Sequence, residues 1–308
     1  MTSLYYFIVN PKSGSNVDIN CVRRLRDYLR ERNHRAVLEL TRSLEHAGEL
    51  AHNAAAAGAK MVVVAGGDGT VRTVADALAE MQIPILIIPC GTENLMAGEL
   101  GLDGSWKTTL NTFEGGLIRQ LDLGQANDRH FMAIVGVGFD AEVVRRVHNL
   151  RSGHISHRSY IWPICRTFWE HKFPHLQVEA DGESLCDEPA LVFVSNISRY
   201  AVGLGISPDA DVSDGLLDLC IYKCDNKLTL LSHSLRTIVG TSDKSRSVIR
   251  RQCRKISIRS GKRNETDTPV QIDGDPGPSL PLEIEVIPAA AQVIVPPSPG
   301  HGKVESGG

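Results

Sequence analysis

The chain has 308 residues, enough for two domains or for one large domain with a well-buried core. Its composition is ordinary for a globular protein, and its formal net charge of -3 argues against nucleic acid as a partner of the whole protein. No apolar run approaches the roughly 20 residues that span a bilayer, and no signal-peptide pattern opens the chain.

The first 125 residues alternate between two hydrophobic periods. Short apolar runs predict strands over residues 4–9, 36–40, 61–65 and 85–88. Helical spacing or Ala-rich composition predicts helices over residues 16–32, 43–58 and 71–81, with a further helix ending near residue 100. Uniformly apolar strands separated by helices are typical of a parallel sheet covered on both faces. Residues 1–125 are therefore predicted to form an α/β domain.

After about residue 125, shorter strand candidates separated by Gly, Asp and Pro turns predict a mainly antiparallel β domain. These candidates lie at residues 131–137, 176–180, 190–195, 217–222, 255–259 and 283–287. Helical stretches at residues 141–150, 159–170 and 229–239 interrupt them. We assign residues 126–288 to this second domain. Residues 289–308, rich in Pro, Gly, Ala and Ser, are predicted to form a disordered tail.

The most informative segment is Gly66-Gly67-Asp68-Gly69-Thr70, between a predicted strand and a predicted helix. Glycines at this junction let backbone N–H groups approach an anion, and the helix N-terminus adds partial positive charge, so we expect a phosphate here. An acidic residue in the loop suits a Mg²⁺ ion or its waters, because hard cations take carboxylate ligands. The alternative is a tight turn in which Asp68 caps the helix.

The same segment is neither a Walker A motif nor a GxGxxG dinucleotide fingerprint. Together with Asn10-Pro11-Lys12-Ser13-Gly14 and Gly91-Thr92-Glu93-Asn94, it resembles the diacylglycerol kinase catalytic domain family. That family includes bacterial lipid kinases, sphingosine kinases and ceramide kinases. The resemblance continues through residues 136–141 (GVGFDA), 208–210 (PDA), 214–218 (DGLLD) and 271–275 (QIDGD), and so covers almost the whole chain before the tail.

The resemblance implies a kinase that uses ATP and Mg²⁺ to phosphorylate a lipid hydroxyl. It makes residues 1–125 the nucleotide-binding domain and residues 126–288 the domain for the lipid acceptor. Nucleotide phosphates are expected at Gly66, Gly67, Asp68, Gly69 and Thr70.

Four further residues belong to the nucleotide contacts that the resemblance implies. They are Asn10, Thr41, Thr92 and Asn94. For Asn10 an Asx turn is a competing interpretation, and for Thr41 a helix N-cap is equally plausible. Asn94 is also expected to hydrogen-bond within its own loop.

The resemblance also implies a structural Mg²⁺ at Asp214. Its ligands would be the Asp214 carboxylate and the backbone carbonyls of Asp211 and Leu216. Taken by itself, the Ser-Asp-Gly sequence at this point is typical of a hairpin turn.

Two Asp-Gly-acid triplets compete for the base that accepts the hydroxyl proton. Asp181-Gly182-Glu183 fits the family's Asp-Gly-Glu better by letters, whereas Asp273-Gly274-Asp275 fits by its order along the chain. We choose the second, so Asp275 and Asp68 are the expected catalytic residues. Asp275 is a methylene shorter than the usual Glu, and Leu95 replaces the Asp of many bacterial members. Both departures bear more on the identity of the lipid than on kinase chemistry.

Several patterns concern the surroundings of the protein. Seven scattered cysteines without a CxxC pair predict reduced, mostly buried thiols of a cytosolic protein. Nine basic residues lie between 244 and 263, and such a segment is predicted to contact an anionic bilayer. We therefore expect a cytoplasmic, peripherally membrane-associated protein that meets its lipid substrate at the membrane surface; a homodimer remains open.

Four aromatic residues, Trp162, Phe168, Trp169 and Phe173, lie in and just after a predicted helix. They are predicted to belong to the core rather than to an acceptor cleft.

The function predicted from these patterns is ATP-dependent phosphorylation of diacylglycerol or a related lipid, with a sphingoid base as one option. One alternative is an NAD kinase-like or other small-molecule kinase, because those families use the same Gly-Gly-Asp-Gly loop. A second alternative is a non-catalytic regulator that binds nucleotide or lipid, which the residues at positions 95 and 275 keep open.

Overall fold

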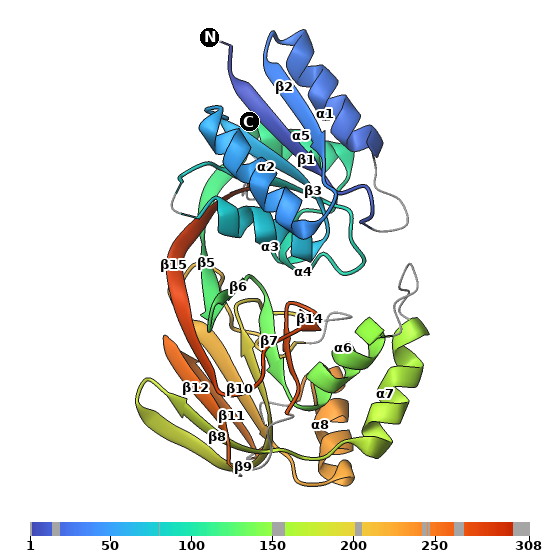
Figure 1. Cartoon of the computed structure of the whole chain (residues 1–308), viewed down its shortest axis with the longest axis vertical. Coiled ribbons are helices and arrows are strands. Elements are labelled where there is room, and N and C mark those ends of the chain that lie inside the picture. Colours follow the sequence, from blue (N-terminus) through green and yellow to red (C-terminus); the bar gives the residue numbers. More distant parts are fainter. Residues whose placement is uncertain are drawn as a thin grey trace, which may run out of the picture.

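The computed structural model describes residues 2–13, 19–79, 81–149, 158–200, 205–241, 245, 247–261 and 268–297. Figure 1 shows two domains joined by two long strands. The first domain contains β1 (Leu4–Val9), α1 (Ile19–Glu31), β2 (Arg35–Leu40), α2 (Leu44–Ala56), β3 (Met61–Gly66), α3 (Asp68–Ala77), β4 (Ile85–Pro89), α4 (Leu95–Glu99) and α5 (Trp106–Gly115).

The remaining elements follow in the second domain, although two of its strands reach back into the first. They are β5 (Leu117–Ala126), β6 (Arg129–Phe131), β7 (Ile134–Val137), α6 (Phe139–Asn149), α7 (Arg158–Glu170), β8 (His175–Ala180), β9 (Glu183–Ser195), β10 (Leu217–Lys223), α8 (Lys227–Val239), β11 (Val248–Cys253), β12 (Lys255–Ser260), β13 (Val270–Ile272), β14 (Asp275–Pro276) and β15 (Leu282–Val295).

The first domain is a parallel sheet with strand order β4-β3-β1-β2, covered on both faces by helices. Side chains of β1 alternate between two cores: Tyr5 and Phe7 pack with α1, and Ile8 packs with α2 and α3. Strands buried on both faces must be apolar throughout, which explains their uniform sequence. The predicted α/β domain is confirmed.

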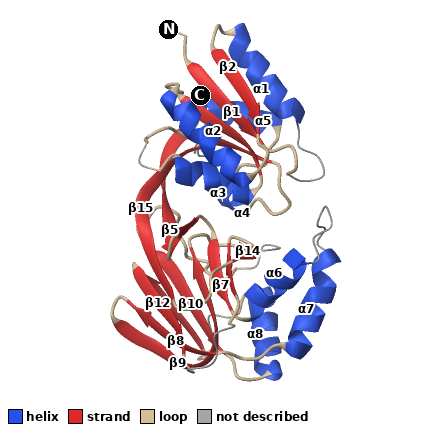
Figure 2. Cartoon of the chain, in the orientation of Figure 1, coloured by secondary structure: helices blue, strands red, loops and turns tan. Residues whose placement is uncertain are grey.

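The second domain is mainly antiparallel, as predicted. Strand β9 is its centre and pairs with β7, β8 and β10. The predicted strand at 131–137 is divided into β6 and β7, because the backbone N–H groups of Met132 and Ala133 bind the Asp273 carboxylate instead of a neighbouring strand. Helices α6, α7 and α8 lie together on one side of this domain (Figure 2).

Strands β5 and β15 form an antiparallel ribbon that passes from one domain into the other. Its far end joins the first sheet, where Val293 pairs with Ile85 of β4. The prediction of a disordered tail from residue 289 is therefore wrong up to Val295, because residues 291–295 pair with β5. Their small and apolar side chains are mostly buried, although the composition resembles that of a linker. Residues 298–308 of the predicted tail lie outside the described residues.

All seven cysteines carry free thiols, and six of them are buried, as predicted. No helix in the described part of the chain is long and apolar enough to cross a bilayer.

Candidate active site

The Gly-rich loop lies where β3 ends and α3 begins. Helix α3 starts at Asp68, after Gly67, whose backbone is extended. Gly67 faces the loop that follows β4 at very short range: a Cβ on Gly91 would lie 2.7 Å from the Gly67 Cα. The loops that follow the parallel strands β3 and β4 are therefore in contact, and the first of them leads directly into the N-terminus of α3.

Asn10 ties the end of β1 to this loop. Its Nδ2 donates to Thr70 Oγ1 at 2.9 Å, and its Oδ1 accepts from the Lys12 N–H at 3.0 Å. The second bond is the Asx turn considered above. Ser13 Oγ also accepts from the Gly67 N–H at 3.2 Å. Gly14, the last residue of this motif, lies outside the described residues.

Thr41 is buried at the end of β2, and its N–H donates to the Val9 carbonyl at 2.9 Å. The N-cap of α2 is Ser43, whose side chain accepts from the His46 N–H. The N-cap interpretation of Thr41 is therefore wrong, and this threonine stays beside the strand end that carries Asn10.

The loop after β4 is closed by Asn94. Its Oδ1 accepts from the Gly91 N–H at 2.7 Å and its Nδ2 donates to the Gly91 carbonyl at 2.9 Å, as expected for this residue. Because both ends of the carboxamide are engaged, Asn94 shapes the loop. Thr92, at the tip, is exposed.

Asp68 does not cap α3, since no side chain caps that helix. Its Oδ1 instead accepts from the Met96 N–H of α4 at 3.3 Å. Burial raises the pKa of this carboxyl, the negative charges of Asp273 and Glu93 add to the rise, and the N–H groups of Leu95 and Met96 oppose it. The carboxylate therefore lies in a desolvated, electronegative place that a cation would stabilise.

Arg72 connects α3 to the hairpin of β13 and β14. Its Nη2 lies 3.4 Å from Asp275 Oδ2 and its Nη1 lies 3.8 Å from Asp273 Oδ2. The guanidinium joins the two domains at the point where the Gly-rich loop and the expected base meet. Sequence reasoning missed Arg72; its signal is a charged side chain in the sequence between Val71 and Val74, which the apolar spacing of this helix places in the core.

The two aspartates of the hairpin differ in surroundings. The Asp273 side chain is 2% exposed and accepts from the N–H groups of Met132, Ala133 and Ile134, each at 2.9 Å. The Asp275 side chain is 29% exposed. Asp273 thus fixes the hairpin, whereas Asp275 is accessible to an acceptor.

The competing triplet lies elsewhere, in the turn between β8 and β9. Asp181 accepts from the Arg254 and Lys255 N–H groups, and Glu183 pairs with Arg251. The turn lines a polar hollow that includes no residue of the Gly-rich loop or of the β13–β14 hairpin.

A second buried carboxylate, that of Asp140, contacts the β13–β14 hairpin. Asp140 Oδ2 accepts from Gln271 Nε2 at 3.1 Å and from the Tyr200 hydroxyl at 3.3 Å. Burial raises the pKa of Asp140 to about 6. Gly136 is required here, because a Cβ would lie 2.8 Å from Asp140 Oδ2. The GVGFDA segment therefore holds β13, the first strand of the hairpin whose second strand carries the expected base.

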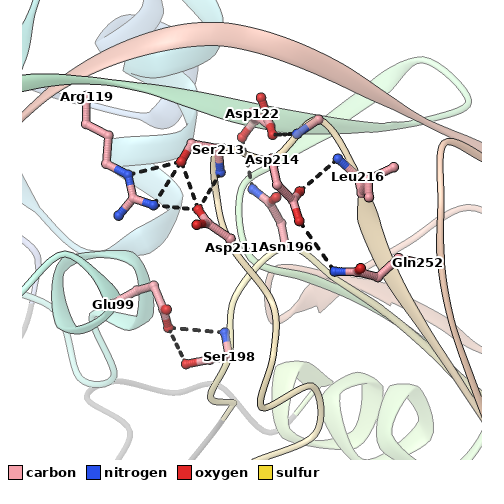
Figure 3. A network of polar contacts seen from close by, with 11 residues as sticks. Glu99, Arg119, Asp122, Asn196, Ser198, Asp211, Ser213, Asp214, Leu216 and Gln252 are labelled. Carbon is pink, nitrogen blue, oxygen red and sulfur yellow. Dashed lines mark hydrogen bonds and ion pairs between the residues drawn. The ribbon is translucent and has the colours of Figure 1, made fainter.

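The Asp214 loop lies at the root of the β5–β15 ribbon (Figure 3). Asp214 Oδ1 accepts from the Leu216 N–H at 2.9 Å, and its Oδ2 has a long 3.4 Å contact with Gln252. Burial raises the pKa of Asp214, and the charges of Asp211 and Asp122 add to this.

The oxygens around Asp214 suit a hard cation, because Mg²⁺ and Ca²⁺ accept carboxylate and carbonyl ligands. Asp211 lies in the same loop as Asp214, and Asp122 of β5 contacts the loop by accepting from the N–H of Gly215, as well as from that of Ala289. The Asp211 carboxylate is engaged by Arg119 and Ser213, and the Asp211 backbone carbonyl has a long 3.5 Å contact with the Asp214 N–H. No cluster of three His, Cys, Asp or Glu side chains able to hold a metal occurs among the described residues, so an ion here would depend on carbonyl ligands.

Two further sets of contacts lie near this loop, and the first of them joins the two domains. Glu99, at the end of α4, accepts from the Ser198 N–H at 3.1 Å and hydroxyl at 2.8 Å (Figure 3). Asn196 Nδ2 donates to the carbonyls of Asp122 and Met132, which joins β5 to the start of the second domain.

Comparison with known proteins agrees with this arrangement. Residues 5–126 match the family described as the diacylglycerol kinase catalytic domain, and residues 133–295 match the YegS C-terminal NAD kinase beta sandwich-like domain. A diacylglycerol kinase of Mycobacterium tuberculosis is 30% identical over 96% of this chain and 95% of the relative. A diacylglycerol kinase of Bacillus subtilis is 24% identical over 94% and 95%.

Solved structures have the same fold. A crystal structure of a diacylglycerol kinase from Bacillus anthracis gives a TM-score of 0.69 at 21% identity, over 96% of this chain and 97% of that one. A second crystal structure from the same organism gives a TM-score of 0.77 at 23% identity. From the domain matches and the relatives, the chain belongs to the diacylglycerol kinase family of lipid kinases.

Proposed function

We propose that this lipid kinase transfers the γ-phosphoryl group of ATP to the free hydroxyl of diacylglycerol, giving phosphatidate and ADP. The observation that carries the proposal is the link through Arg72, which joins the helix of the Gly-rich loop to the accessible carboxylate of Asp275. The lipid is chosen because the relatives from Mycobacterium tuberculosis and Bacillus subtilis are both named diacylglycerol kinases.

The nucleotide phosphates would bind at the N-terminus of α3. The first N–H groups of a helix have no partner within the helix, and the helix dipole favours negative charge there. Asn10 and Thr41 border this point from the neighbouring strand ends, and Thr92 lies at the exposed tip of the loop after β4. Mg²⁺ would neutralise phosphate charge when bound, with Asp68 as the carboxylate facing it.

Asp275 would accept the proton of the acceptor. The hydroxyl oxygen forms the new bond to the γ-phosphorus, its proton passes to the Asp275 carboxylate, and the bond to the bridging oxygen of ADP breaks. Arg72 holds the carboxylate at the mouth of the nucleotide loop, and the three N–H bonds of Asp273 keep the hairpin in place. Positioning of this kind is the main contribution a protein makes to phosphoryl transfer.

A structural Mg²⁺ would be held by Asp214 with the backbone carbonyls of Asp211 and Leu216. The donor set of hard oxygens and the mutual repulsion of Asp214, Asp211 and Asp122 support this. Such an ion would stiffen the root of the ribbon rather than take part in the reaction. ATP as donor and diacylglycerol as acceptor imply a cytoplasmic enzyme in peripheral contact with the membrane.

The test is incubation with labelled ATP and a panel of diacylglycerol, sphingosine and NAD, followed by identification of the product. Labelled phosphatidate is expected, and Asp68→Asn should abolish most of it while preserving the melting profile, because the amide keeps the acceptor for Met96. Labelled NADP would favour the small-molecule kinase. Nucleotide binding without transfer to any member of the panel would favour the regulator.

A further inference from the structure

Exposed apolar side chains are concentrated on two helices. The described part of the chain exposes twelve large hydrophobic residues, and eight of them lie on α7 and α8. Scattered apolar residues on a surface are ordinary, but a contiguous group marks an interaction site. The eight are Trp162, Ile164, Trp169, Leu228, Leu231, Leu235, Ile238 and Val239.

Helix α8 has the reverse of the usual amphipathic pattern. Only Leu230 and His233 are buried, and Thr237 on the same inner side is half-buried. Its outer side carries all five of its exposed apolar residues within an arc of about 100°, at 3.6 residues per turn. A helix that directs leucines into water must have another partner for that face.

Helix α7 continues the same surface. Trp162 and Trp169 lie seven residues apart, on one helix face, and are 57% and 70% exposed, so the prediction that they belong to the core is wrong. Phe168 and Phe173, the other two residues of that prediction, do pack against the core. The Lys227 ammonium lies 5.0 Å from the Trp169 ring, which joins the start of α8 to the end of α7.

Charge points to a bilayer as the occupant of this surface. By helical geometry, Lys227 and Arg236 border the stripe of α8 on opposite sides. Arg166 lies over the Trp162 ring at 5.2 Å but is also paired with Glu170, so Lys227 and Arg236 are the basic residues that flank the surface most directly. An apolar stripe with basic flanks and tryptophans is the pattern of helices that lie in the interface of an anionic membrane.

The position of the surface also fits a bilayer. Helix α7 packs on α6, and α6 contacts β13 and β14, which carry the expected base (Figure 1). The basic segment at 244–263 is less available: among its described residues, Arg251, Lys255 and Arg259 are paired with glutamates. Lys244, Arg246, Lys262 and Arg263 lie outside the described residues.

We propose that α7 and α8 dock the protein on the surface of an anionic bilayer. The α7–α8 face is defined as Trp162, Trp169, Leu228, Leu231, Leu235 and Ile238. The proposal rests on the proposed function, because a diacylglycerol dissolved in the bilayer must be reached from its surface. Docking by this face brings the acceptor side of the β13–β14 hairpin toward the lipid.

The test compares two matched double variants. Leu235→Gln/Ile238→Gln alters the α7–α8 face, and Leu117→Gln/Ile118→Gln alters equally exposed residues of β5 as a control. Co-sedimentation with vesicles of phosphatidylcholine and phosphatidylglycerol should fall by on the order of tenfold or more for the first variant and stay unchanged for the second. Unchanged melting profiles are expected for both, because the altered side chains are exposed.

Activity separates this proposal from the proposed function. With water-soluble dihexanoylglycerol both variants should match the native protein, whereas with long-chain diacylglycerol in vesicles only the first should lose activity. If the first variant binds vesicles normally and remains active on both substrates, the docking proposal is overturned. It is also overturned if the variant changes only the sedimentation coefficient, which would make the face a contact between two copies. No activity of the native protein on either substrate, with vesicle binding intact, would overturn the proposed function alone.

Discussion

Three aspartates near the Gly-rich loop have the same side chain but differ in burial and in hydrogen bonding. Asp273 is enclosed and bound by three N–H groups, Asp68 is largely buried and accepts from the Met96 N–H at 3.3 Å, and the Asp275 side chain is 29% exposed. Burial raises the pKa of Asp68 and of Asp273, and for Asp273 the charge of Arg72 opposes the rise. Only Asp275 combines accessibility with a fixed position.

Asp275→Asn should reduce turnover by on the order of 10²–10⁴, because the amide keeps the shape but cannot accept the proton. ATP affinity should change little, since Asp275 is expected to act on the acceptor hydroxyl and not to contact the nucleotide phosphates. Steady-state kinetics with saturating lipid measure both quantities. Asp181→Asn is the matched control and should be nearly silent, as its carboxylate binds two N–H groups in a distant turn. Loss of turnover in the control but not in Asp275→Asn would move the base to the other triplet.

Asp140→Asn should stabilise the protein at neutral pH. The pKa of Asp140 is about 6 in the folded protein against 3.8 for the free group, so the folded state binds the proton more tightly. The free energy of unfolding therefore falls as pH rises from about 4 to 6, by on the order of 2–3 kcal/mol. Asn can keep its carbonyl oxygen toward Gln271 and Tyr200 without this loss. Thermal melts at about pH 8 and pH 4 should show a gain only at the higher pH; an equal gain at both would exclude titration of Asp140 as the cause.

At the scale of elements, the sequence predicts best what hydrophobic pattern alone decides. Strand β1 has the predicted bounds, because five of its six residues are buried. Strands β5 and β11 were missed, since β5 exposes Leu117 and Ile118 at its start, and β11 carries basic residues in a row.

Only those parts of the candidate site that lie in local sequence motifs could be predicted. Local motifs suggested Asp68 and Asp275 as candidates, but the contact of Arg72 with Asp275 spans about two hundred residues of sequence, and no local pattern records it. Glu99 and Ser198 were missed for the same reason, because both are unremarkable polar residues until the domains meet.

The two phosphate-side loops depend on each other's glycines. Gly91→Ala places a Cβ 2.7 Å from the Gly67 Cα, which is backbone and can move only if the whole loop moves. Kinase activity should fall at least tenfold, with a destabilisation on the order of 1–3 kcal/mol, as for other overpacked sites. Gly98→Ala in α4 is the control, since a Cβ there meets nothing within 4 Å. Equal activity and equal melting temperatures for the two variants would show that the loops are less tightly packed than described.

At the scale of the whole molecule, the β5–β15 ribbon not only connects the two domains but also pairs with the sheet of the first domain. A chain ending after residue 288 would lose the pairing of residues 291–295 with β5 and the contact of Val293 with β4. Its buried side chains Ala290, Ala291, Val293 and Ile294 would be lost as well. We expect this truncation to abolish cooperative folding of the first domain, as measured by thermal unfolding. A chain ending after Pro297 keeps all of β15 and should melt like the full chain; if both truncations did so, the ribbon would not stabilise the first domain.

The path of β15 also bears on the order in which the two domains can fold during synthesis. Domains generally fold as units, N-terminal first, during synthesis. Here the first sheet is completed at the edge of β4 by residues close to 295. We therefore expect the apolar edge of β4 to stay unpaired until almost all of the second domain has been synthesised, and to be accessible to chaperones or to neighbouring nascent chains during that interval.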